Sequence, residues 1–211
     1  MQFPKTHGQC VYVRHIQANK PILIATGPAG SGKTLLVCQE AVRMIRSRQV
    51  GKIIFTRPIV AADEDMGYLP GEMERKMEPW AKPMMEIMEN YLTHNQINAR
   101  TYIEPLGFMR GRTFTNSFII ADEMQNSTPN QMKMLLTRVG ENTKLVVTGD
   151  TSQSDLGEEN GLTDIINKIN GLECDYVSHM EMDNDDVMRH PAVSEICLLY
   201  TSDAADDTLW V

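Results

Sequence analysis

Short apolar runs recur along the chain and alternate with longer stretches of helical periodicity. The clearest runs lie at 22–26, 52–56, 117–121 and 144–148. Apolar residues at consecutive positions predict strands that are buried on both faces, because successive side chains of a strand point to opposite sides of the sheet. Weaker strands are expected at 101–103 and 175–179.

The stretches between these runs carry the apolar spacing of helices. Helices are expected at 6–18, 35–46, 72–80, 83–93, 129–139 and 161–169. Pro79 and Pro83 separate the third of these helices from the fourth, because proline interrupts a helix. A loop rich in Pro, Gly and acidic residues is expected from the second strand to Gly71. Strands that alternate with helices predict a single α/β domain in which helices cover both faces of a parallel sheet.

The strand at 22–26 leads directly into the sequence GPAGSGKT. This sequence matches the pattern G-x-x-x-x-G-K-[ST], in which glycines let the backbone wrap around phosphate and the following helix offers free N–H groups. The expected nucleotide-binding residues are Gly27, Pro28, Ala29, Gly30, Ser31, Gly32, Lys33 and Thr34. Lys33 is expected to reach the β- and γ-phosphates, and the Thr34 hydroxyl to ligate Mg²⁺. The motif predicts a P-loop NTPase.

A buried strand that ends in a carboxylate should supply the second half of such a site. The strand at 117–121 is followed by Asp122, which is placed to hold Mg²⁺, and by Glu123, which can polarise water for attack on the γ-phosphate. Gln153 follows the buried strand at 144–148 and could bond to the γ-phosphate or the attacking water. Because parallel strands end at one edge of a sheet, these side chains are expected to meet there.

An arginine is also expected, because negative charge develops on the γ-phosphoryl oxygens during transfer. The candidates are Arg57, Arg110, Arg112, Arg138 and Arg189. Two of them belong to the segment 109–112, which is expected to form an exposed basic turn. The sequence alone does not indicate which of these arginines acts on the γ-phosphate.

Six segments together resemble the PhoH family. They are GPAGSGKT, TRPIVAADEDMGYLPGEMERKMEPW, MRGRTF, FIIADEMQNSTPNQMKMLLTRVG, VVTGDTSQSDL and VMRHPAV. The similarity runs over residues 6–196. It implies a phosphate-starvation-associated ATPase of bacteria or phages, with a RecA-like core related to helicases.

The resemblance also implies roles for particular residues. It implies ATP and Mg²⁺ as ligands, with Lys33, Glu123 and Gln153 in the ATPase motifs. Arg138 and Arg189 match family arginines that serve as fingers or sensors, including across a subunit interface. Gln9 stands near the position of an adenine-reading glutamine, and Thr56-Arg57-Pro58 matches a segment that lies near nucleic acid in related helicases. The resemblance further implies a homo-oligomer, which is expected to be a hexameric ring.

Composition limits these expectations. The formal net charge is −8, so any contact with nucleic acid must come from a local basic patch. No apolar run approaches the roughly 20 residues of a membrane span. The 4 Cys form no C-x-x-C pair, which favours a reducing cytoplasm.

The last fifteen residues are expected to be foreign to the protein. The string CLLYTSDAADD at 197–207 resembles a translated sequencing-library adapter. Residues 1–196 are therefore expected to form the ATPase domain and 197–211 an artefactual tail, with the native C-terminus missing. Without the tail, which holds three Asp and no Lys or Arg, the net charge changes from −8 to −5.

The favoured hypothesis is an Mg²⁺-dependent ATPase that couples hydrolysis to handling single-stranded RNA or DNA. Arg57, Arg110 and Arg112 are the candidate nucleic-acid contacts. Two alternatives stay open at this point, a nucleotide-gated assembly protein without turnover and a small-molecule kinase. The sequence does not decide between RNA, DNA and a protein as the client, nor the direction of any translocation.

Overall fold

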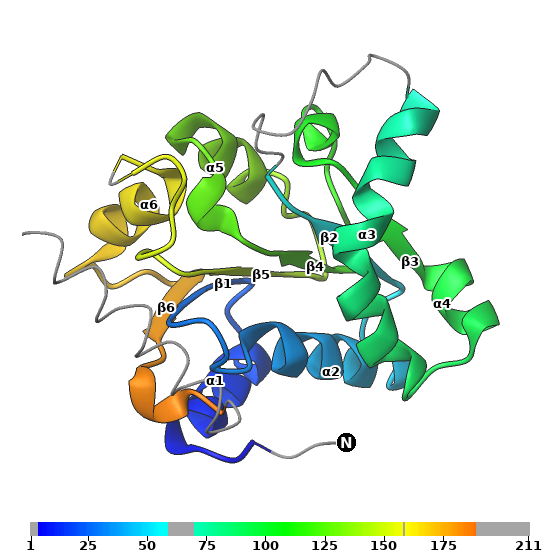
Figure 1. Ribbon diagram of the computed structural model, residues 1–211, viewed down its shortest axis with the longest axis horizontal. Helices are drawn as coiled ribbons and strands as arrows, with labels where there is room; N and C mark the ends of the chain where they lie inside the picture. Colours follow the sequence, from blue (N-terminus) through cyan, green and yellow to red (C-terminus); the bar gives the residue numbers. More distant parts are fainter. Residues whose placement is uncertain (1–3, 59–69, 158, 189–211) are drawn as a thin grey trace, which may run out of the picture.

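A six-stranded sheet lies at the centre of the molecule, whose computed structural model describes residues 4–58, 70–157 and 159–188 (Figure 1). The strands are β1 (Ile22–Thr26), β2 (Lys52–Thr56), β3 (Thr101–Ile103), β4 (Ser117–Ala121), β5 (Thr143–Gly149) and β6 (Val177–Glu181). They pair in the order β3-β2-β4-β5-β1-β6, and every pairing is parallel. The expected α/β fold, a single domain built on a parallel sheet, is confirmed.

Helices cover both faces of this sheet. Figure 1 shows α1 (His7–Gln17) and α2 (Lys33–Arg46) below the sheet, with α5 (Pro129–Leu136) and α6 (Gly161–Ile169) above it. Side chains of β4 alternate between two buried clusters, with Phe118 and Ile120 on the α2 side and Ile119 on the α5 side. The continuous apolar strands of the sequence are therefore explained by burial on both faces.

The strand order brings the ends of three strands together. β5 lies between β1 and β4, with Thr26 opposite Gly149 and Ala121 opposite Val147. All three strands run in the same direction, so the segments that follow them emerge at one edge of the sheet. We call this edge the phosphate edge, because the loop 27–34 leaves β1 there.

One expectation about the helices was wrong. Residues 72–80 and 83–93 were expected to form two helices, but a single helix, α3 (Pro70–Glu89), contains both Pro79 and Pro83. The two prolines are exposed, whereas Ala81, Met84 and Met88 on the other side are buried. Met84 and Met88 belong to the same buried cluster as the apolar side chains of α2. Packing of this apolar side outweighs the loss of two intrahelical hydrogen bonds on the solvent side.

The remaining differences are one additional helix and small shifts at the ends of elements. The additional helix, α4 (His94–Arg100), begins with a capping box between Thr93 and Gln96. α5 ends at Leu136, and β6 begins two residues later than expected. Short 3₁₀ turns complete the described chain as η1 (Leu106–Met109), η2 (Met124–Asn126) and η3 (Asn184–Asp186).

Replacement of the helical prolines should stabilise the protein. A proline inside a helix costs about 3 kcal/mol relative to Ala, offset by less than about 1 kcal/mol through the unfolded chain. Pro79→Ala and Pro83→Ala should each raise the free energy of unfolding by about 2 kcal/mol in urea titrations. Pro129→Ala is the control, because Pro129 occupies the first turn of α5, where proline is tolerated. A loss of stability at both α3 positions would show that packing requires the prolines.

Candidate functional site

The loop 27–34 joins β1 to the first turn of α2. Gly32 is the N-cap of α2 and has φ +89°, a left-handed conformation that glycine adopts without strain. This turn points the N-terminus of a 14-residue helix at the space beside the loop. The free N–H groups and the positive end of the helix dipole favour an anion there.

The Lys33 side chain is folded onto the loop. Its ammonium donates to the carbonyl oxygens of Gly27 at 2.6 Å and Pro28 at 2.9 Å, and to Ser31 Oγ at 3.2 Å. Burial lowers the pKa of Lys33, while the carboxylates of Asp150, Asp122 and Glu123 oppose that shift. The ammonium therefore lies within the field of three acids at the phosphate edge and has donors that a phosphate could engage.

Asp122 follows β4 and is almost fully buried, at 8% exposed. One carboxylate oxygen accepts a hydrogen bond from Thr148 Oγ1, and both oxygens lie 3.5 Å from Thr34 Oγ1. Burial raises the pKa of Asp122, and the charge of Glu123 raises it further. The bond from Thr148 and the charge of Arg57 lower it. In the folded chain the ionisation of Asp122 is therefore less favourable than that of a free carboxyl group.

These oxygens suit Mg²⁺. Among the residues that the structure describes, no group of three or more His, Cys, Asp or Glu side chains could hold a metal by itself. Asp122 and Thr34 offer one carboxylate and one hydroxyl as ligands. Mg²⁺ is usually held in this way, by one or two carboxylates with water and substrate phosphate completing its shell.

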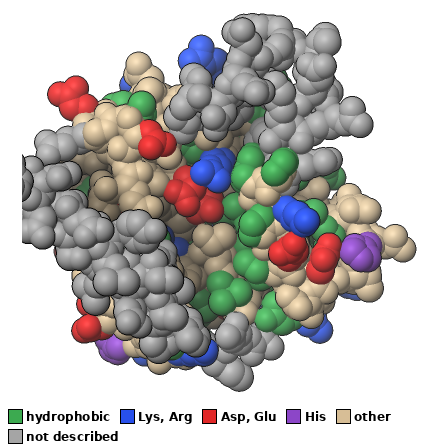
Figure 2. Space-filling model, in the orientation of Figure 1, with side chains coloured by type: hydrophobic (Ala, Val, Ile, Leu, Met, Phe, Trp, Pro, Cys, Tyr) green, Lys and Arg blue, Asp and Glu red, His purple; other side chains and the backbone are tan. Residues whose placement is uncertain are grey.

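A cavity of about 260 Å³ connects these groups at the phosphate edge. Its lining residues come from the P-loop and from the segments after β4 and β5. They include Ala29, Gly30, Gly32, Lys33, Thr34, Asp122, Glu123, Asp150 and Gln153. The volume lies below the roughly 300–1,000 Å³ of pockets that enclose a whole drug-sized ligand, so it suits a phosphate chain. Figure 2 shows an acidic and a basic group side by side near the middle of one face, next to hydrophobic side chains.

Glu123 has an unusual backbone. Its φ of +54° and ψ of +36° are left-handed, a conformation that is uncommon outside glycine and is found at functional sites. Its carboxylate accepts a hydrogen bond of 2.6 Å from Gln125 Nε2. Gln125 was missed by the sequence reasoning. Its only signal was a polar residue close to the acid pair, and nothing in the sequence reveals that it is buried.

The Gln9 side chain lies under the P-loop rather than in the cavity. Its Nε2 donates to the Ser31 carbonyl at 3.1 Å, and its Oε1 accepts from the Lys5 N–H at 2.8 Å. Gln9 is 6% exposed and is absent from the described lining of the cavity. In this arrangement Gln9 supports the loop backbone, and its adenine-reading role remains a prediction.

The structure does not place the candidate arginines in the described lining of the cavity. Arg57 is half-buried after β2, near Asp122, with its guanidinium 6.0 Å from the centre of the Trp80 ring. Arg110 is exposed. Arg112 bonds to Glu104 at 2.7 Å and lies over the Phe114 ring. Arg189 lies outside the described residues.

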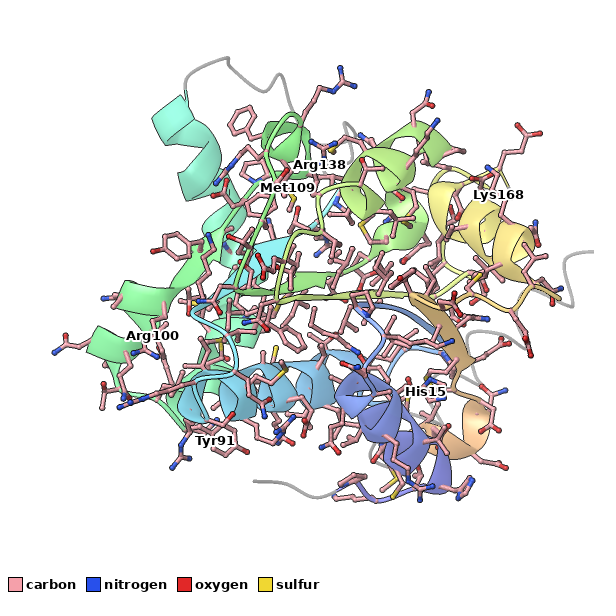
Figure 3. All side chains as sticks on the ribbon, turned by 180° about the vertical axis from the view of Figure 1, so that it is seen from behind. His15, Tyr91, Arg100, Met109, Arg138 and Lys168 are labelled. Atoms are coloured by element: carbon pink, nitrogen blue, oxygen red, sulfur yellow. The ribbon has the colours of Figure 1, made fainter. Side chains whose placement is uncertain are left out.

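Arg138 lies at the other edge of the sheet from Asp122. Its carbonyl accepts from the N–H of Phe114, three residues before β4 begins, whereas Asp122 follows the end of β4. The five-residue strand β4, which spans about 16 Å, lies between the Arg138 carbonyl at one end and Asp122 at the other. The guanidinium bonds to the carbonyls of Met134 and Arg112, beside the segment of Met109 (Figure 3). A role for Arg138 at a γ-phosphate therefore requires the site of another subunit.

Comparison with known proteins gives the family. The family model described as "PhoH-like protein" matches residues 3–201. The chain belongs to the PhoH-like family. It is 41% identical over 203 residues to the PhoH-like protein of Bacillus subtilis, covering 93% of this chain and 63% of that protein. It is 36% identical over 194 residues to the protein PhoH of Escherichia coli K12, covering 88% of this chain and 54% of that one.

This PhoH-like chain thus spans less than two thirds of the relatives' length. A solved structure of Pif1 helicases is only distantly similar. Its TM-score is 0.35 and its identity 12%, over 90% of this chain and 46% of that one. The family match enters the segment 197–211, whose foreign origin remains a prediction. In the part of the chain that the structure describes, no helix is long and apolar enough to cross a bilayer.

The buried acid should lower the stability of the free protein. Because the pKa of Asp122 is raised in the folded chain, its ionisation costs stability as the pH rises above the ordinary value of 3.8. Without nucleotide or Mg²⁺, Asp122→Asn should have a higher Tm than the wild type at pH 7. The difference should shrink as the pH falls and Asp122 takes up a proton.

Calorimetric scans from pH 4 to pH 8 would test this expectation. Asp155→Asn is the control, because Asp155 is exposed in the loop after β5. A lower Tm for Asp122→Asn at pH 7 would contradict it and show that the hydrogen bond from Thr148 outweighs the cost of burial.

Proposed function

We propose that this PhoH-like chain is an Mg²⁺-dependent ATPase that couples hydrolysis to the remodelling of single-stranded nucleic acid, with RNA favoured over DNA as the substrate. One observation carries the ATPase part. A single cavity is lined by the P-loop lysine and threonine, the adjacent acids Asp122 and Glu123, and Gln153. These are the parts that P-loop NTPases combine for phosphoryl transfer to water.

The binding roles follow from the contacts. The backbone of residues 27–34 and the α2 N-terminus would wrap the β- and γ-phosphates. Lys33 would exchange its bonds to the Gly27 and Pro28 carbonyls for phosphate oxygens. Thr34 and Asp122 would hold Mg²⁺, which when bound neutralises phosphate charge. The hydrogen bond from Thr148 holds the Asp122 carboxylate in place beforehand, and Thr34 Oγ1 already lies 3.5 Å from that carboxylate.

The hydrolytic roles fall on the segments after β4 and β5. Glu123 would accept a proton from the attacking water, and Gln153 would report the γ-phosphate from the facing loop. An arginine would stabilise the charge that develops on the transferred group. Arg138 would act from a neighbouring subunit of the expected hexameric ring, and Arg189 is the other candidate.

The nucleic-acid part rests on three cations that lie in two places, the turn after η1 and the segment after β2. Arg110 and Arg112 are exposed in the turn after η1. Arg57 lies beside Trp80, an aromatic surface on which a base could stack. With a net charge of −8, the chain would offer phosphates these individual cations rather than a generally basic surface.

ATP turnover is the first test of this function. Glu123→Gln keeps the shape of the side chain and removes the base, and general-base catalysis contributes about 10²–10⁴-fold. We expect kcat to fall at least about 100-fold, with nucleotide affinity nearly unchanged. The measurement is phosphate release by the full chain with and without single-stranded RNA. Nucleotide binding without turnover in the wild type would instead support the assembly protein, and turnover that requires a small acceptor would support the kinase.

RNA binding is tested at the exposed turn, since Arg57 also acts on Asp122. Arg110→Ala should weaken binding of a single-stranded RNA several-fold and leave ATP affinity intact. Loss of one phosphate contact lowers the slope of log K against log salt by about 0.7 for single strands. Arg100→Ala is the matched control, because Arg100 is exposed at the end of α4. Equal RNA affinity and salt slope in both variants would remove this turn from the interface.

A further inference from the structure

We propose that Gln125 is a positioning residue that holds the Glu123 carboxylate for water activation and links it to the loop carrying Gln153. The inference rests on the proposed ATPase function and names a part of its machinery that the motifs leave out. Gln125 lies in η2, two residues after Glu123, and is 1% exposed.

The Gln125 amide is used at both ends. Its Nε2 donates to Glu123 Oε2 at 2.6 Å, and its Oε1 accepts from the backbone N–H of Asp150 at 3.2 Å. The partners fix the orientation of the amide, because a carboxylate can only accept and an N–H can only donate. A single side chain therefore bridges the segment after β4 to the end of β5.

The bond to Glu123 has a positioning effect. Glu123 is half-buried, and its left-handed backbone starts the turn that returns the chain to Gln125. A glutamate has three rotatable side-chain bonds, and a charge-assisted hydrogen bond from a buried donor restricts them. A general base must lie within hydrogen-bond reach of its water, so this restriction favours one productive placement.

The same turn is bonded to the loop after β5. The Gln125 carbonyl accepts from Ser154 Oγ at 2.8 Å, and Asn126 Oδ1 accepts from the Asp155 N–H at 2.9 Å. Gln153 lies between Asp150 and Ser154, the two residues that Gln125 contacts. A displacement of the Gln153 loop would therefore move Gln125 and, through it, the Glu123 carboxylate.

Gly149 makes room for this bridge. A Cβ at Gly149 would lie 2.6 Å from Gln125 Oε1 and 2.6 Å from Leu162 Cδ2, closer than real Cβ atoms approach. The amide thus occupies the space that the missing side chain leaves at the end of β5. A side chain at position 149 would displace the Gln125 amide, so the bridge requires glycine there.

Substitution of Gln125 by its own isostere gives the sharpest test. Gln125→Glu keeps the shape and the acceptor for Asp150, but turns a carboxylate oxygen toward Glu123 in place of the donor. Gln125→Met removes both hydrogen bonds without adding charge, which keeps the test valid if the first variant fails to fold. Gln39→Glu is the matched control. Gln39 lies on α2, is 4% exposed, and donates to the hydroxyl of Tyr91, which follows α3; it is absent from the described lining of the cavity.

Steady-state ATP hydrolysis by the full chain, with Tm and nucleotide affinity, separates a positioning role from a structural one. Misplacement of a catalytic group by about 1 Å costs about 100-fold. We expect kcat to fall about 10- to 100-fold in both Gln125 variants, with KM changed less than about threefold and kcat unchanged in the control. In a Glu123→Gln background the Gln125 substitution should cause no further loss, because groups that act as a unit are not additive.

Several results would overturn the proposal. Wild-type kcat in both folded Gln125 variants would do so. A parallel loss of Tm, affinity and kcat, or a full further loss in the Glu123→Gln background, would assign Gln125 a structural role. If turnover is lost in Glu123→Gln but kept in the Gln125 variants, the inference alone fails. If the wild type has no turnover with ATP, Mg²⁺ and RNA, the proposed function fails first and this inference with it.

Discussion

The rest of the site depends on one buried carboxylate, that of Asp122. A carboxylate that is 8% exposed is unfavourable in its ionised form, which is why its pKa is raised. The chain offers it the Thr148 hydroxyl, the Thr34 hydroxyl at 3.5 Å and the nearby charge of Arg57. These groups moderate the cost of burial without removing it, and a bound cation would offset what remains.

The parallel sheet explains why so many groups meet there. β1, β5 and β4 are adjacent and run in the same direction, so the P-loop, the Asp122 segment and the Gln153 loop leave the sheet at one edge. The opposite edge receives the end of α5 and Arg138, which separates that arginine from the cavity of its own chain. A complete charge-stabilising set then requires either a neighbouring subunit or the segment that begins at Arg189.

The sequence predicted the parts of this structure that follow from local pattern. Fully apolar runs identified the strands. The P-loop motif, together with the acids after β4 and Gln153, identified most of the residues that line the cavity, although Gly27, Pro28 and Ser31 of the predicted loop are not among them. The pattern failed where tertiary packing outweighs local preference, as in α3, whose apolar side holds Pro79 and Pro83 inside one helix. It also could not find Gln125, since the significance of that residue lies in contacts across two strands.

The central claim is that Asp122 and Thr34 form an Mg²⁺ site that is completed by nucleotide phosphate. The most direct measurement is electron paramagnetic resonance of Mn²⁺, used in place of Mg²⁺, with the full chain and a non-hydrolysable ATP analogue. The account predicts a protein-bound Mn²⁺ signal that requires the nucleotide and is lost in Asp122→Asn. A signal of equal strength in that variant, or one that forms without nucleotide, would contradict it.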